Sequence, residues 1–197
     1  VTDIRVFSGR TSTGVRGIKL ANKKDEVISM SVLKHLDVSP DERNAYLKAS
    51  GAAEGVEIEE TNLQLTPDRF QEMKSKEQFL LTVSNKGFGK RTSSYEYRLS
   101  GRGGQGVTNM ALTSKNGGEV VATFPVTDSH QIMLVSDKGQ LIRTPVETVR
   151  ITGRSAQGVT IFRVAPDEEV VSVAWLIQED DDEEVETGDL LLVVGEV

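Results

Sequence analysis

A motif that occurs three times along the chain constrains its fold more than any other feature. Each copy reads Ser/Thr-Gly-Arg-x-x-x-Gly-Val, and the copies span residues 8–15, 100–107 and 152–159. Two further segments, 79–87 and 131–139, match each other upstream of the second and third copies. Internal repetition is typical of folds built from repeated supersecondary units. We therefore expect a repeat protein.

The spacing of the motif predicts an insertion between its first two copies. Gly101 and Gly153 are 52 residues apart, whereas Gly9 and Gly101 are 92 residues apart. The first interval therefore holds 40 more residues than the second. The β-like alternation stops over residues 36–75, and we place the insertion there.

Two short helices are expected inside this insertion. Ser39-Pro-Asp-Glu42 has a capping residue, a Pro at the first helical position and a Glu at the third, which predicts a helix through about Ala49. Thr66-Pro-Asp-Arg-Phe-Gln-Glu-Met73 has the same signature and predicts a second helix.

The repeat unit has the pattern of a four-stranded antiparallel sheet. Residues 131–135 and 140–144 flank a Ser-Asp-Lys-Gly turn, which predicts a β-hairpin. Strands at 159–164 and 170–174 are expected to complete the sheet. Four short antiparallel strands per repeat of about 50 residues are typical of a propeller blade.

These patterns predict an all-β, propeller-like repeat domain, a fragment of a larger disc, with a small α-helical insertion. The chain is expected to begin inside a repeat, and a parent with more blades is expected because two and a half blades cannot close a ring. The predicted segments are the second half of an incomplete blade at 1–35 with a strand at 26–30, an acidic, partly helical insertion at 36–75, complete blades at 76–128 and 129–178, and an acidic tail with a possible terminal strand at 179–197.

Composition argues against several classes of site. The chain has no Cys, which excludes disulfides, thiolate metal ligands and a Cys nucleophile. Its two His residues have no ligand spacing, and no nucleophile–base–acid arrangement is present, so we expect no metal site and no catalytic residue. Apolar runs fall far short of the ~20 residues that span a bilayer. We expect a soluble cytoplasmic protein without a membrane partner.

The net charge of −7 conceals a basic repeat body. The insertion holds nine acidic and four basic residues, and residues 179–189 hold eight acidic residues and no basic one. The remainder of the chain therefore carries a net charge of +6. Regular positive charge fits a nucleic-acid backbone, so a DNA partner is not excluded by the overall sign.

Cations recur at equivalent positions of the repeats, and equivalent positions of a propeller lie on one rim. Such an arc would contact duplex phosphates without reading the base sequence. A structural role, in which the Arg side chains cap backbone carbonyls, is the alternative, and the motif glycines favour turns over phosphate cradles. The predicted DNA-binding residues are Arg10, Arg16, Lys19, Lys86, Lys90, Arg91, Arg98, Arg102, Lys138, Arg143, Arg150 and Arg154.

The segment Leu80–Val107 resembles the C-terminal domain of the A subunit of bacterial DNA gyrase, in the type IIA topoisomerase family, as do Gln131–Arg143, Val149–Arg154 and Gln157–Val159. The resemblance implies a six-bladed β-pinwheel, in which neighbouring blades exchange strands, and DNA wrapping that assists ATP-dependent negative supercoiling. It also implies that an acidic C-terminal tail, such as residues 179–186, modulates wrapping.

The resemblance further implies partners outside this chain: double-stranded DNA, the N-terminal part of the A subunit of gyrase, and the B subunit of gyrase in an A2B2 holoenzyme at the nucleoid. ATP and Mg belong to that holoenzyme, and no cofactor is expected in this chain. The family's Gln-Arg-Arg-Gly-Gly-Lys-Gly box has no full match here, and the DNA-cleaving tyrosine belongs to the N-terminal part. The alternatives are the C-terminal domain of topoisomerase IV and a propeller-like interaction scaffold that docks partners on the acidic insertion.

Overall fold

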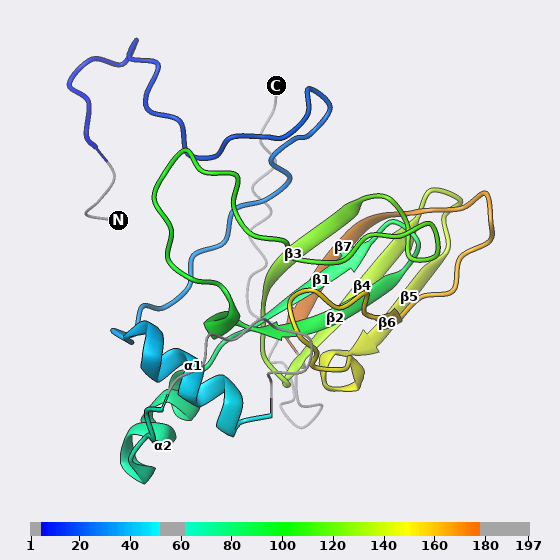
Figure 1. Cartoon of the computed structure of the whole chain (residues 1–197). Coiled ribbons are helices and arrows are strands. Elements are labelled where there is room, and N and C mark those ends of the chain that lie inside the picture. Colours follow the sequence, from blue (N-terminus) through cyan, green and yellow to red (C-terminus); the bar gives the residue numbers. More distant parts are fainter. Residues whose placement is uncertain (1–4, 52–61, 178–197) are drawn as a thin grey trace, which may run out of the picture.

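A computed structural model describes residues 5–51 and 62–177 of the chain (Figure 1). Within these residues there are two α-helices, seven strands and two short 3-10 turns. The helices are α1 (Pro40–Ala49) and α2 (Pro67–Lys76), and the 3-10 turns are η1 (Ser94–Glu96) and η2 (Val146–Thr148). The strands are β1 (Phe79–Ser84), β2 (Phe88–Ser93), β3 (Val120–Val126), β4 (His130–Ser136), β5 (Leu141–Pro145), β6 (Val159–Thr160) and β7 (Val170–Ile177).

The strands form two antiparallel sheets, in the orders β3-β1-β2-β6 and β5-β4-β7. The hairpin β4–β5 confirms the predicted Ser-Asp-Lys-Gly turn, and β1–β2 forms the same hairpin around the matching Ser84-Asn-Lys-Gly87. Strands β3 and β7 lie against each other, and both sheets contribute to one apolar core. Its fully buried side chains include Leu81, Val83, Ile132 and Leu134. Burial of this core is the main term that stabilises the described part of the chain.

The repeats exchange a strand, so a sheet is not the same unit as a repeat. β6 belongs to the last repeat but pairs with β2 of the preceding one, with Phe88 opposite Thr160 and Gly89 opposite Val159. Residues 129–178 therefore contribute three strands to the second sheet and one to the first, and the predicted blade bounds stay a prediction. The strand predicted at 159–164 contains two residues, because the next two N–H groups, of Ile161 and Phe162, both donate to Gly87 O and the regular ladder ends there.

Residues 5–39 form no helix or strand, although a strand was predicted at 26–30. The equivalent strands β3 and β7 each pair with a hairpin of their own repeat, and residues 5–25 contain no hairpin. A lone extended segment has no ladder partner to stabilise it. A few hydrogen bonds hold this stretch to the rest of the chain, such as the one that Ser29 Oγ donates to Thr123 O at 3.2 Å.

Both helices of the insertion begin where their caps predict. In α1, the Ser39 hydroxyl accepts from the Glu42 N–H at 3.2 Å, and the Glu42 carboxylate accepts from the Ser39 N–H at 2.9 Å, which completes a capping box. In α2, the Thr66 hydroxyl accepts from the Arg69 N–H at 3.3 Å. These side-chain acceptors satisfy amides that the first helical turn leaves unpaired.

Tyr46 of α1 anchors the insertion to the first sheet. Its side chain is 1% exposed, and its ring centroid lies 5.0 Å from that of Phe70 and 5.1 Å from that of Tyr95. Its hydroxyl donates to Glu77 Oε2 at 2.8 Å. Because Tyr95 belongs to η1, directly after β2, this cluster fixes α1 and α2 beside the end of that strand.

The last glycine of each motif has a left-handed backbone. The φ angles of Gly14, Gly106 and Gly158 are 77°, 79° and 80°, a region that side chains with a Cβ disfavour. At Gly158 the neighbouring chain also matters, because a Cβ there would lie 2.7 Å from the Gly89 carbonyl oxygen. At Gly14 no atom lies within 4 Å of the equivalent point.

This difference provides a matched test of the exchanged strand. Gly14→Ala should cost about 1–2 kcal/mol, as expected for a left-handed backbone alone. Gly158→Ala should reduce the free energy of unfolding further, since its methyl group would push β6 away from β2. Urea denaturation of the two variants measures both losses. Equal losses would contradict the close approach of these strands.

Candidate nucleic-acid interface

The structure divides the twelve predicted DNA-binding cations into three groups by exposure. Lys90 and Arg91 are buried, and Lys86 and Arg154 are half-buried. The exposed group consists of Arg10, Arg16, Lys19, Arg98, Arg102, Lys138, Arg143 and Arg150. Cations at equivalent repeat positions therefore differ in their exposure to solvent.

Lys90 is a structural residue rather than a surface contact. Its side chain is 0% exposed, and its Nζ donates to the carbonyl oxygens of Gly153, at 2.8 Å, and Arg154. Both acceptors belong to the motif of the next repeat. A fully buried ammonium group bound to these carbonyls has no path to a phosphate, so the assignment of Lys90 to the DNA contact is corrected.

Arg91 binds the same neighbouring segment. Its side chain is 7% exposed, its Nε donates to Val149 O at 2.7 Å and its Nη2 to Glu147 O at 3.2 Å, and its Nη1 forms an ion pair with Asp128. Its backbone pairs as well, donating to Arg150 O at 3.0 Å. Arg91 is likewise removed from the DNA contact.

We call this arrangement the interblade joint: β2 with Lys90 and Arg91 on one side, and residues 147–162 of the next repeat on the other. Cationic donors suit it because the loop carbonyls have no ladder partners, and hydrogen bonds from charged groups are stronger than neutral ones. The alternative weighed from the sequence, arginines that cap carbonyls, is thus observed at Arg91, and also at Arg154 of the third Gly-Arg motif, whose Nη1 donates to Thr108 O.

Two half-buried cations also hold backbone carbonyls. Lys86 Nζ donates to Glu168 O at 3.0 Å and to Pro166 O at 3.3 Å, and it lies 3.2 Å from a carboxylate oxygen of Glu169. Arg154 Nη1 donates to Thr108 O at 2.5 Å. These contacts tie neighbouring repeats together, which leaves Lys86 and Arg154 only partly available to a ligand.

Lys138 and Arg143 are the second-repeat equivalents of Lys86 and Arg91, and both are exposed. Lys138 pairs with Asp167, and Arg143 Nε donates to the side chain of Gln131. Exposed pairs of this kind contribute little to stability and exchange readily with other anions. Both residues remain candidates for a surface role.

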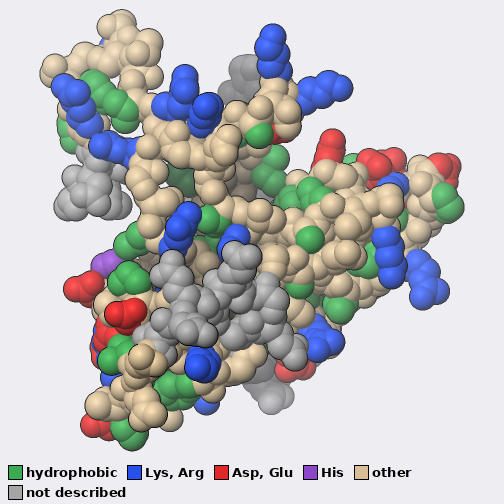
Figure 2. Space-filling view, in the orientation of Figure 1, with side chains coloured by type: hydrophobic (Ala, Val, Ile, Leu, Met, Phe, Trp, Pro, Cys, Tyr) green, Lys and Arg blue, Asp and Glu red, His purple; other side chains and the backbone are tan. Residues whose placement is uncertain are grey.

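The exposed cations of the first two motifs lie on loops that pair with each other. The Gly103 N–H donates to Gly17 O at 2.8 Å, and the Lys19 N–H donates to Gly104 O at 2.8 Å. This reciprocal pairing brings together the segments that carry Arg16, Lys19 and Arg102, which we call the paired-loop surface. Figure 1 shows these two segments side by side, and Figure 2 shows Lys and Arg side chains gathered over them.

The same stretch holds exposed cations that the repeat comparison missed. Lys23, Lys24 and Lys34 lie outside the aligned motif, so position within the repeat could not identify them. The signal available was composition, because residues 5–34 contain seven basic and two acidic residues. Local charge balance was therefore the better guide to this surface.

Burial perturbs the ionisable groups around the joint. It lowers the pKa of Lys90 to about 8, although the nearby Glu96 carboxylate opposes this shift. It also raises the pKa of Glu96, whose Oε2 accepts from the Arg154 N–H at 2.5 Å. Both shifts have desolvation as their largest cause, since the charged form loses its hydration in the interior.

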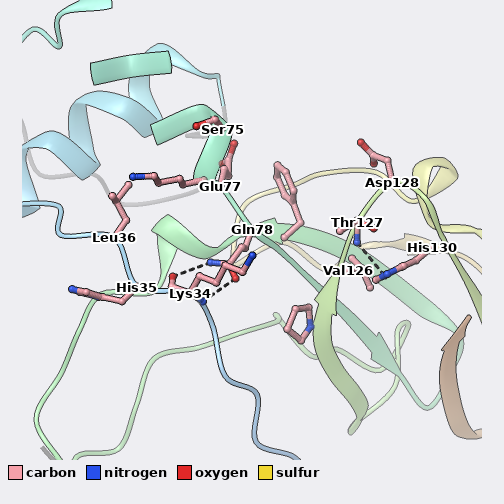
Figure 3. Close-up of a pocket in the computed structure, with 13 residues that line it drawn as sticks. Lys34, His35, Leu36, Ser75, Glu77, Gln78, Val126, Thr127, Asp128 and His130 are labelled. Carbon is pink, nitrogen blue, oxygen red and sulfur yellow. Dashed lines mark hydrogen bonds between the residues drawn. The ribbon is translucent and has the colours of Figure 1, made fainter. Parts of the chain in front are cut away.

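A cavity of about 760 Å³ lies where the insertion meets the sheets (Figure 3). The Gln78 side chain crosses it to the backbone of Lys34, with one bond to the N–H and one to the carbonyl, both 3.0 Å. Two carboxylates line the cavity, and both already have partners. Glu77 accepts hydrogen bonds from Tyr46 and Ser93, and Asp128 forms an ion pair with Arg91. The cavity thus lies at the boundary between the insertion and the sheets, and its lining residues form no catalytic arrangement.

Neither a metal site nor a membrane span is found over residues 5–51 and 62–177. No group of three or more His, Asp or Glu side chains there could hold a metal ion. Neither helix described here is long and apolar enough to cross a membrane.

A family model for the DNA gyrase C-terminal domain, a β-propeller, matches residues 1–34, 78–127 and 130–174. The chain belongs to this family. The match leaves out residues 35–77, which contain α1 and α2. The matched residues include the two antiparallel hairpins and the exchanged strand β6 described above.

Individual relatives agree with the family assignment. The chain is similar to the A subunit of DNA gyrase from Granulibacter bethesdensis, with 50% identity over 188 residues that cover 86% of this chain and 20% of the relative. It is 46% identical to the A subunit of DNA gyrase from Rickettsia bellii over 191 residues, which cover 93% of this chain and 21% of the relative. The chain thus spans about a fifth of the curated relatives it matches.

Among solved structures, the chain is similar to a DNA gyrase A C-terminal domain, with 31% identity and a TM-score of 0.47. That likeness covers 50% of this chain and 33% of the solved chain.

The buried Lys90 predicts a pH dependence of stability. Its pKa falls from 10.5 when unfolded to about 8 when folded, so between these values the unfolded chain holds one more proton than the folded chain. The free energy of unfolding should therefore rise with pH from about 8 to 10.5, relative to Lys90→Met, by at most about 1.4 kcal/mol per pH unit.

Urea denaturation of the wild type and of Lys90→Met at several pH values measures this difference. Because both proteins contain the same tyrosines, subtracting one free energy of unfolding from the other cancels the contribution of tyrosine titration. A difference between wild type and Lys90→Met that stays constant over that window would show that Lys90 keeps its ordinary pKa in the folded state, against the burial described here.

Proposed function

We propose that the chain binds double-stranded DNA and serves as a DNA-wrapping module in the A subunit of a DNA gyrase. The observation that carries this proposal is the paired-loop surface, where backbone hydrogen bonds between two loops bring together the segments that carry the exposed Arg16, Lys19 and Arg102. Clustered cations match the regular negative charge of duplex phosphates. The name of the relatives, as A subunits of DNA gyrase, supports the same partner.

The contact is proposed to be independent of base sequence. The described helices α1 and α2 belong to the insertion, and each has acidic residues in its first turn, so neither offers a basic helix for the major groove. Phosphate contacts alone position DNA without specifying it. Cations spread over the paired-loop surface and beyond it, at Arg10, Arg98 and Arg150, would bend the duplex along the protein.

The chain is proposed to contribute wrapping and no bond chemistry. All three tyrosines have engaged hydroxyls: Tyr46 donates to Glu77, Tyr95 to Met73 O at 2.9 Å, and Tyr97 to Asn109. Burial raises the pKa of each, to about 12 for Tyr97. A tyrosine held neutral in this way is a poor nucleophile, which supports a site of DNA cleavage elsewhere in the larger protein.

In that larger protein we propose the roles that the relatives' name implies. The chain would act with the N-terminal part of the A subunit of gyrase and with the B subunit of gyrase during ATP-dependent negative supercoiling, at the nucleoid in the cytoplasm. ATP and Mg would bind to those other parts. A topoisomerase IV C-terminal domain is the runner-up within the same family, and a scaffold that binds proteins through the insertion is the alternative from another class.

A pair of matched variants tests the DNA contact. Arg16→Gln with Arg102→Gln removes two cations from the paired-loop surface, and Lys48→Gln with Lys74→Gln removes two exposed cations from the insertion. The first pair should weaken binding to all duplexes about equally and lower the salt dependence of log K by about two, whereas the second should change little.

Titrations of several unrelated DNA duplexes at two salt concentrations measure both effects. Equal losses in the two variants would place the contact elsewhere, and a loss confined to one DNA sequence would contradict phosphate recognition. No affinity of the wild-type chain at low salt would exclude the wrapping role and favour the scaffold.

The acidic run Glu179–Glu186 provides a second test, because like charges repel DNA at distances up to the Debye length. Deletion of this run should raise the affinity for DNA at low salt and have a smaller effect at high salt. A titration at both salt concentrations checks this, and an unchanged or weaker affinity would show that the run does not compete with DNA.

A further inference from the structure

A second cavity, of about 520 Å³, lies between the insertion and the loop that follows β2. It adjoins the cavity of Figure 3, and Lys34, Leu36 and Gln78 line both. The start of α1 and the last residue of α2 lie on one side of it, and η1 with residues 97–99 lies on the other. All of its lining residues fall between positions 33 and 99, so neither end of the chain is needed to form it.

The charged side chains that line this second cavity are all basic. They are Lys34, Arg43, Lys76 and Arg98, and no Asp or Glu lines it. The insertion at 36–75 holds nine acidic and four basic residues, so the lining is opposite in sign to the segment that forms one of its walls. Like charges around one cavity repel each other, and an anion placed among them offsets this repulsion. The lining therefore favours an anionic ligand.

Arg69 of α2 binds the carboxylates that could otherwise neutralise these cations. Its Nε lies 2.8 Å from Glu42 Oε1, and its Nη1 lies 2.7 Å from Glu72 Oε2. The hydrogen bond from Arg69 lowers the pKa of Glu42 to about 2, so this carboxylate stays charged and paired. Arg43, the next residue in the chain, donates instead to the neutral Oδ1 of Asn44, from Nε at 3.3 Å and from Nη2 at 2.9 Å. The charge of Arg43 is thus left without a counterion in the described structure.

The other three cations of the cavity are also available to a ligand. Within residues 5–51 and 62–177, neither Lys34 nor Arg98 forms an ion pair, and both are exposed. Lys76 Nζ lies 2.8 Å from Glu72 Oε1, but the two side chains are 52% and 40% exposed. A pair this exposed contributes little to stability and exchanges readily with another anion.

Apolar and aromatic residues form much of the remaining wall. The Tyr95 hydroxyl donates to Met73 O at 2.9 Å, which fixes this residue of η1 against α2. Pockets for small molecules measure about 300–1,000 Å³ and combine apolar walls with a few charged groups. The second cavity has this size and this composition, which suits an anion attached to an organic body. The apolar and aromatic lining residues are Leu33, Leu36, Val38, Tyr95, Tyr97 and Leu99.

We propose that this cavity binds a small phosphorylated molecule, with a diphosphate among the four cations and an organic body against the apolar wall. Arg and Lys side chains bind phosphate oxygens through short, charge-assisted hydrogen bonds. A diphosphate carries several negative charges and offsets several of the cations, whereas a single carboxylate offsets one. Mg²⁺ is held by carboxylates, and none lines the cavity, so the ligand binds without a metal ion. This ligand is therefore distinct from the ATP of the proposed supercoiling reaction.

Titration calorimetry with ADP in the presence of EDTA tests the site, and inorganic pyrophosphate and adenosine separate its two parts. ADP should bind the wild-type chain at one site. Pyrophosphate should bind more weakly because it lacks the organic body, and adenosine should not bind detectably because it lacks the phosphates. Leu99 is 90% exposed, so Leu99→Ala leaves the core intact. This variant should weaken the binding of ADP and leave that of pyrophosphate unchanged.

Two double variants with the same change in net charge test the cations. Arg43→Gln with Lys76→Gln removes one lining cation from each helix of the insertion, and Lys48→Gln with Lys74→Gln removes one cation from each helix outside the lining. The first pair should raise the Kd for ADP about a hundredfold, since each lost charge-assisted hydrogen bond corresponds to about tenfold. The second pair should change it less than about twofold. Urea denaturation checks that both variants are folded.

Three results would overturn the proposal: no binding of ADP to the wild-type chain, equal losses in the two double variants, or adenosine that binds as tightly as ADP. A duplex titration distinguishes the source of the phosphate. If ADP does not bind and Arg43→Gln with Lys76→Gln weakens duplex binding, the cavity contacts the DNA backbone and the proposal of a free ligand is wrong.

The same titrations keep this proposal separate from the proposed function. Arg16→Gln with Arg102→Gln should weaken duplex binding and leave the Kd for ADP unchanged, because neither residue lines the second cavity. A chain that binds DNA without ADP would overturn only the ligand site, and a chain that binds ADP without DNA would overturn only the wrapping role.

Discussion

The structure depends on the way one repeat completes the sheet of another. The outer edge of β2 is covered by a segment from the following repeat, and Lys90 and Arg91 bind the carbonyls of that segment. Neither side of this joint can complete its hydrogen bonds alone, because the loop carbonyls need donors and the edge of β2 needs a partner strand. The same requirement explains why residues 5–39 lack strands and why β5 has an open edge among the described residues.

The joint also determines which cations can reach a ligand. Arg91 and Arg143 occupy equivalent positions in their hairpins, yet one is buried and the other exposed. A cation at the joint replaces its hydration with backbone carbonyls, and burial lowers the pKa of Lys90 accordingly. Cations on the paired-loop surface keep their hydration and remain able to exchange it for phosphate oxygens.

Much of the fold was predictable because it depends on neighbours in sequence. The caps at Ser39 and Thr66, the two hairpin turns and the presence of an inserted helical pair all rest on signals within a few residues. The strand predicted at 26–30 and the length of the strand at 159–164 were wrong, because extended segments form ladders only where another strand is present. The paired loops around Gly17 and Gly103 were not predicted, since the residues that they join lie 86 positions apart.

The sequence alone determined the family, the repeat, the position of the insertion and the segregation of charge, all of which are properties of residue order. Only the tertiary structure decided the role of each repeated cation. Equivalent positions in a repeat have equivalent environments only if both neighbours are present, and among the residues that the structure describes no segment covers the second hairpin as residues 147–162 cover the first. Arg91 therefore became part of the interior while Arg143 stayed at the surface, because desolvation and hydrogen bonding act on the packed partner and not on the local sequence.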